Sequence, residues 1–183
     1  MCQFFSGVIT KNKTLVDYNN DSHELLIQKA GLNDTTRNPK FVRVELLPQD
    51  GNIWNHNIKN WKLRVDQDFR PDWFEKKWAE NEMQNEIKKL WEERFIIDDK
   101  SWRKLKDGRF WVLRSKVEAR ENSSVVARDN SSVVAWGNSS VVIPSSANIK
   151  IKDIQNNASV KDLSSSPIIY VANTDIKLKV FKK

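Results

Sequence analysis

The pattern of apolar and polar positions is most regular between residues 117 and 152, where a unit of eight residues recurs. Residues 121–128, 129–136 and 137–144 read ENSSVVAR, DNSSVVAW and GNSSVVIP. The same spacing extends beyond these copies in two apolar series: Val117, Val125, Val133, Val141 and Ile149, and Ala119, Ala127, Ala135, Ile143 and Ile151. An even period keeps each side chain on one face of a strand, because strand side chains alternate with a period of two. The octads therefore predict stacked β-strands with valine and alanine inside.

Two β-architectures fit these octads. Identical short units that stack on one another build a β-solenoid, which is the arrangement we predict. Asp-Asn at residues 129–130 and Gly-Asn at residues 137–138 also suit the two-residue turns of hairpins, so an antiparallel meander is the alternative. The inward side chains are small in both cases, which leaves little room for a ligand inside.

The first hundred residues do not contain the octad. Their pattern of apolar and polar residues predicts strands that do not belong to a repeat. We expect strands over residues 3–10, 14–18, 41–47 and 61–65. In the third of these, apolar and polar residues alternate so that Val42, Val44 and Leu46 form a face suited to burial.

Two helices are expected in the same part of the chain. Asp21 is the predicted N-cap of a short helix, with Glu24 as its capping-box partner and Gly31 as its stop. One long helix is predicted over residues 72–95, because apolar residues recur there at helical spacing. We therefore expect an α+β head domain with one long helix at residues 1–100. An all-β, octad-repeat domain resembling a β-solenoid should follow at residues 101–183, after a hairpin-type turn at Asp107 and Gly108.

Composition narrows the class of protein. The chain has 39% hydrophobic and 30% charged residues, as globular proteins do. It contains no apolar run near the ~20 residues that span a bilayer, and its first residues do not resemble a signal peptide. The single cysteine excludes an internal disulfide or a multi-cysteine zinc site, and two histidines are too few to suggest a metal centre. We expect no cofactor, no membrane partner and a cytoplasmic location.

Positive charge is concentrated in the second half of the chain. Residues 1–100 carry 16 basic and 17 acidic side chains, whereas the remainder carries 15 basic and 7 acidic ones. The basic run at residues 103–120 is interleaved with aromatic residues, a combination that suits contact with nucleic acid. The alternative is a solvated surface with aromatic residues facing the interior. The candidate binding residues are Arg103, Lys104, Lys106, Arg109, Arg114 and Trp136.

Cys2 is the residue most suggestive of catalysis. Removal of Met1 would place its thiol beside a free α-amine, which can serve as the base in an N-terminal nucleophile hydrolase or transferase. His23 is a natural proton carrier, and Arg43 and Glu45 share one strand face, so these three are its candidate partners. In the alternative, Cys2 is a small buried apolar residue, and Arg43 and Glu45 form an exposed pair.

Several short motifs carry a resemblance to a known family. They read MCQFFS at residues 1–6, DSH at 21–23, VRVE at 42–45 and PDWF at 71–74. In this order, ahead of Val/Ser-rich repeats, they resemble uncharacterised proteins of phages and bacterial mobile elements. The resemblance implies a phage accessory protein in the host cytoplasm that binds and inhibits host machinery, such as a CRISPR nuclease. The resemblance brings no established biochemical activity and no catalytic residues.

Three hypotheses of function follow. The first is a binding protein that inhibits a host protein or ribonucleoprotein complex, in the manner of an anti-CRISPR protein, with nucleic acid contact through residues 103–120. The repeat would then act as a spacer, a basic docking face or a surface for homo-oligomer formation. The second is an enzyme that uses Cys2, and the third is a structural component of the phage particle.

Overall fold

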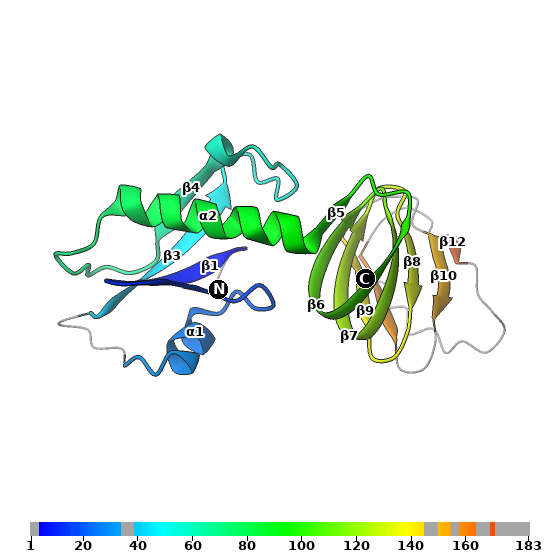
Figure 1. The fold of residues 1–183 in the computed structure, drawn as a ribbon, viewed down its shortest axis with the longest axis horizontal. Coiled ribbons are helices and arrows are strands. Elements are labelled where there is room, and N and C mark those ends of the chain that lie inside the picture. The colour runs from blue at the N-terminus through cyan, green and yellow to red at the C-terminus, as the bar shows by residue number, and fades with distance from the viewer. Residues whose placement is uncertain (1–3, 34–38, 145–149, 155–157, 164–168, 171–183) are drawn as a thin grey trace. The chain divides into compact units, whose positions relative to one another are not determined.

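The computed structural model describes residues 4–33, 39–144, 150–154, 158–163 and 169–170. It is mostly β-structure, with two α-helices in the described residues. The chain divides into two compact units, Met1–Glu93 and Arg94–Lys183. Figure 1 shows a small sheet with its helices in the first unit and stacked strands in the second.

An antiparallel sheet forms the centre of the first unit. Its strand order is β2 (Thr14–Val16), β1 (Ser6–Thr10), β3 (Phe41–Pro48) and β4 (Trp61–Val65). A short 3₁₀ helix, η1 (Ile58–Asn60), leads into β4. The alternation predicted for β3 is confirmed, since Val42, Val44 and Leu46 are all 0% exposed.

The two helices pack on opposite faces of this sheet. Helix α1 (His23–Lys29) places Leu26 and Ile27 in one core cluster with Val8 of β1. Helix α2 (Lys76–Arg94) places the thioether of Met83 against the neighbouring residue, Gly7. Because adjacent strand residues point to opposite faces, these contacts sandwich the sheet between the helices.

The start of α1 differs from the prediction by one residue. Ser22, not Asp21, is the N-cap, and its hydroxyl oxygen accepts a hydrogen bond from the amide of Leu25. Asp21 instead accepts a 3.1 Å hydrogen bond from the backbone amide of Phe5. Serine and aspartate cap helices equally well, so the hydrogen bond from the amide of Phe5 to Asp21 decides which of the two residues is the N-cap.

The second unit is a β-solenoid, as predicted. Its strands pair in parallel, which rules out the antiparallel meander. Lys116 pairs with Ser132 and Val125 pairs with Val141, so one coil contains sixteen residues, or two octads. The strands are β5 (Phe95–Ile97), β6 (Trp102–Leu113), β7 (Lys116–Arg128), β8 (Ser132–Ala135), β9 (Ser140–Ile143), β10 (Lys150–Ile154), β11 (Ser159–Asp162) and β12 (Ile169–Tyr170).

Two parallel sheets face each other in this solenoid. Strands β6 and β7 each pass round a corner, so their first halves lie in one sheet and their second halves in the other. The first sheet continues through β8, β10 and β12, and the second contains β5, β9 and β11. Successive octads therefore alternate between the sheets.

The corners of the solenoid use left-handed backbone. Asp98, Asp107, Arg114, Glu121, Asp129, Asn130 and Gly137 all have positive φ, at intervals close to one octad. The hairpin predicted at Asp107 and Gly108 is wrong, because both residues lie inside β6 and the chain continues in the same rotational sense. Short polar residues and glycine suit both kinds of turn, so local sequence does not separate them.

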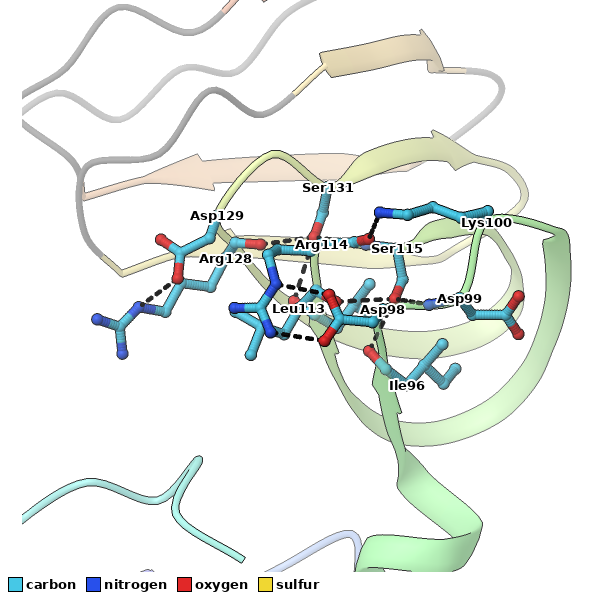
Figure 2. A network of polar contacts seen from close by, with 11 residues as sticks. Ile96, Asp98, Asp99, Lys100, Leu113, Arg114, Ser115, Arg128, Asp129 and Ser131 are labelled. Carbon is cyan, nitrogen blue, oxygen red and sulfur yellow. Dashed lines mark hydrogen bonds and ion pairs between the residues drawn. The ribbon is translucent and has the colours of Figure 1, made fainter.

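Small apolar side chains fill the interior. Val117, Ala119, Val125, Ala127 and Val133 are all 0% exposed and belong to one core cluster. A buried serine follows each corner from Arg114 to Gly137, at positions eight residues apart: Ser115, Ser123, Ser131 and Ser139. Ser115 donates to the carbonyl of Leu113 and accepts from the amide of Asp99, so it ties two coils together (Figure 2).

Candidate functional site

The predicted catalytic residues lie along one face of the sheet in the first unit, apart from Cys2, which is outside the described residues. Arg43 and Glu45 share a face of β3, since strand residues two apart point the same way. The same face carries Val8, because Val8 pairs with Arg43, and Val8 contacts α1. His23 is the first residue of α1.

His23 is a buried link between three parts of the first unit. Its side chain is 1% exposed, its Nε2 lies 3.0 Å from the carbonyl oxygen of Val44, and its Nδ1 lies 3.4 Å from Oδ2 of Asp66. A carbonyl oxygen can only accept, so Nε2 carries a hydrogen. Both ring nitrogens are thus directed at structural partners, and the ring fastens α1 to β3 and to the end of β4.

Glu45 is linked to Asp66, the partner of His23, through Arg64. Its side chain is 0% exposed, which contradicts the exposed pair with Arg43 that is the alternative interpretation of the sequence. Its Oε2 lies 2.9 Å from Arg64, whose guanidinium is half-exposed and also approaches Asp66 at 3.9 Å. Arg43 lies over the ring of Phe41, 5.5 Å from its centroid. Glu45 and Arg64 are cross-strand partners, a signal that the opposite charges and alternation of the two strands already contained.

The predicted binding residues divide between several surfaces of the solenoid. Lys104, Lys106 and Trp136 come together on the outer side of the first sheet. We call this surface the cationic face. It consists of the outward side chains of the first halves of β6 and β7, of β8, and of the residue after β8: Trp102, Lys104, Lys106, Lys116, Glu118, Arg120, Ser132, Val134 and Trp136.

The strand register arranges the cationic face as a grid. Trp102 pairs with Lys116, and Lys104 pairs with Glu118. Lys106 pairs with Arg120, whose guanidinium lies 5.8 Å from the ring centroid of Trp136 in the next coil. Neighbours lie about 5 Å apart between strands and about 7 Å apart along a strand.

Two cations on this face have acidic partners. Arg120 contacts Glu118 at 2.7 Å, and Lys106 contacts Glu121 at 2.7 Å. Lys104 and Lys116 make no ion pair within the described part of the chain. The indole Nε1 of Trp136 is buried and has no hydrogen-bond partner among the described residues. The face therefore offers two cations without acidic partners in the described structure, together with the partly exposed ring of Trp136.

The other three predicted residues are used elsewhere. Arg114 holds Asp98 through two 2.6 Å hydrogen bonds at one corner (Figure 2). Arg103 contacts Asp99 at 2.6 Å, and Arg109 lies on the second sheet, 4.8 Å from the ring centroid of Trp111.

The corner ion pairs shift the titration of their members. Arg114 lowers the pKa of Asp98, and Asp98 raises the pKa of Arg114. Hydrogen bonds from Ser101 and Arg103 lower the pKa of Asp99 to about 2. These arginines are bound by acidic partners at the corners. The cationic face also contains Trp102, Lys116 and Arg120, which are not among the six candidate binding residues.

A shallow cavity of about 390 Å³ lies on the first unit, lined by His56, Ile58, Lys88, Trp91 and Glu92. His56 stacks on Trp91 with their centroids 4.5 Å apart, and burial lowers the pKa of this histidine. The cavity is open and its two charged residues are of opposite sign, which fits no particular ligand class.

The described part of the chain has neither a metal-binding cluster nor a helix that could span a membrane. In that part of the chain, no group of three or more His, Cys, Asp or Glu side chains is placed to hold a metal ion. Neither described helix combines the length and apolar character needed to cross a membrane. No protein-family model, curated protein or solved structure matches the chain.

Proposed function

We propose that this chain is a phage accessory protein that binds host machinery through the cationic face of its β-solenoid and inhibits it. The first unit acts as an α+β head domain built around its long helix, α2. The solenoid acts as a rigid support for the docking surface. The phage context comes from the MCQF, DSH, VRVE and PDWF signatures and implies action in the bacterial cytoplasm.

The observation that carries this proposal is the strand register of the first sheet. It collects Trp102, Lys104, Lys116 and Trp136 on one outer surface, although they come from three different strand segments of the chain. Tryptophan and basic residues are enriched where protein surfaces bind partners. The interior is filled by valine and alanine that are 0% exposed, so the outside of the solenoid is where binding is expected.

The partner we propose is a host defence complex, such as a CRISPR ribonucleoprotein. Its test is phage plating on bacteria that carry an active, phage-directed CRISPR nuclease. Expression of the wild-type chain should raise the efficiency of phage plating, and the double variant Lys104→Glu/Lys116→Glu should abolish that increase. The matched control is Arg128→Glu/Lys161→Glu, which reverses two charges on the outer side of the second sheet and should act like wild type. No increase with the wild-type chain would refute inhibition of this defence.

The N-terminal-cysteine enzyme stays a prediction that concerns Cys2. The contacts of His23 weigh against it, because both ring nitrogens are directed at Val44 and Asp66. The variant Cys2→Ala decides the matter: full retention of the plating effect removes the enzyme hypothesis, and its loss in a folded variant would favour it. Self-association through the repeat is tested by light scattering, and a virion role by mass spectrometry of phage particles.

A further inference from the structure

We infer that the ligand of the cationic face is single-stranded nucleic acid, held by its phosphates on lysine and by base stacking on tryptophan. This inference rests on the proposed docking role of the same face and adds the chemical class of the partner. It follows from three features of the grid: its charge, its aromatic residues and the small side chains of β8.

The charge of the face favours a polyanion. Four cations, Lys104, Lys106, Lys116 and Arg120, accompany one acid, Glu118, which is already bound to Arg120 at 2.7 Å. Lys104 and Lys116 have no acidic partner in the described part of the chain, and Lys106 remains 62% exposed beside Glu121 at the corner. Cations in this state are free to replace the counterions of phosphate groups.

The aromatic residues favour unpaired bases. Trp102 is 39% exposed, and Trp136 is partly exposed with the guanidinium of Arg120 on its ring. The two tryptophans lie two strands apart and at opposite ends of the strand segments, so the lysines lie between them. Single-strand binding proteins combine such stacking rings with a basic track, whereas a duplex hides its bases from them.

The small outward side chains of β8 suit a strand that crosses the coils. Ser132 and Val134 continue the surface between the two tryptophans with small side chains. A duplex would be contacted only along one ridge of phosphates, without stacking. Single-stranded probes should therefore bind more tightly than duplex probes of the same length.

The test measures fluorescence anisotropy of a labelled oligothymidylate and an oligouridylate of about 16 nucleotides, with a duplex of equal length for comparison. Wild-type protein should bind both single strands more tightly than the duplex. The logarithm of its affinity should fall with the logarithm of salt concentration at a slope of about −2, as expected for about three phosphate contacts.

Two variants and a control separate the contributions. Lys104→Glu/Lys116→Glu should lower affinity at least tenfold and flatten the salt slope, because it removes two phosphate contacts. Trp102→Ala/Trp136→Ala should lower affinity at least tenfold while leaving the slope unchanged, because stacking releases no counterions. Arg128→Glu/Lys161→Glu, on the second sheet, should bind as wild type does. Circular dichroism is to be measured for each variant, to check that it keeps its β-structure.

The outcomes distinguish this inference from the proposed function. Absence of oligonucleotide binding, equal binding of duplex, or equal loss in the control variant would overturn the inference. If plating still depended on Lys104 and Lys116, the docking role would stand with a protein partner. If the oligonucleotides bind through the cationic face but expression of the wild-type chain does not raise phage plating, the inference is supported and host inhibition is refuted.

Discussion

The carbonyl of Glu121 accepts a 2.9 Å hydrogen bond from Asn138, and a Cβ placed on Gly137 would lie 3.2 Å from the amide nitrogen of Glu121. Glu121 and Gly137 thus stack directly at the same corner of successive coils. Both have left-handed backbone, with φ of 56° and 67°. The corner of the solenoid therefore requires an unusual backbone conformation and close approach at once.

Gly137→Ala should destabilise the solenoid by about 1–2 kcal/mol, because an L-residue with this backbone brings its Cβ too close to the chain. The free energy of unfolding in urea measures the effect. Asn130→Gly is the control, since Asn130 has φ of 52° and glycine relieves strain there. It should be neutral or slightly stabilising, and equal stability of wild type and Gly137→Ala would contradict the argument.

Ala135→Leu should cost about 1–3 kcal/mol, because the side chain is 0% exposed and the stacked coils leave no space for a larger one. Val134→Leu, at the adjacent outward position, should change stability by no more than about 0.5 kcal/mol. Thermal unfolding of the pair tests the alternation directly. Similar losses in both variants would show that the solenoid core is not on the side assigned to it.

Gly7→Ala should destabilise the first unit by about 1–3 kcal/mol, since its new Cβ would lie 2.7 Å from the sulfur of Met83. Met83→Ala alone should cost about 2–5 kcal/mol, because it opens a cavity under α2. In the double variant the cost of Gly7→Ala should largely disappear, as the clashing atoms are gone. Additive losses in the double-mutant cycle would mean that α2 does not pack on Gly7.

Acid should weaken the corner at Asp99. The pKa of this carboxyl is lowered to about 2 by hydrogen bonds from Ser101 and Arg103, below its ordinary value of 3.8. A depressed folded-state pKa stabilises the fold above pH 3.8, and that contribution disappears as the pH falls toward 2. Asp99→Asn should therefore be less stable than wild type at pH 6 and equally stable near pH 2. A stability difference that does not change between these pH values would exclude the linkage.

The sequence contained more about the solenoid than about the first unit. Eight-residue spacing and alternation of apolar residues were enough to place Val125 and Ala127 inside and Val126 outside, because these are local properties of a strand. The buried face of β3 followed in the same way from the alternation of apolar and polar residues. The N-cap of α1 was displaced because Phe5, from another element, recruits Asp21.

The candidate site was predicted only in part. Lys104, Lys106 and Trp136 were selected as basic or bulky residues near the repeat, and they share one face. Arg103 and Arg114 looked equivalent in sequence but are bound by Asp99 and Asp98 at corners. A charge count cannot separate an exposed cation from one that is held by an acid at a corner.

By itself, the sequence determined that the octads at residues 121–144 form stacked short strands, and which of their side chains enter the core. Those properties depend on periods of two and eight residues, which can be recognised within a short stretch of the sequence. Only the tertiary structure decided that two octads close one coil, so that Lys116 lies beside Trp102 and Ser132. The spacing also departs from sixteen residues between β6 and β7, where Trp102 pairs with Lys116, and between β9 and β11, where Ser140 pairs with Ser159. Coil closure depends on how left-handed corners and long-range hydrogen bonds fit together, and it alone assembles the cationic face.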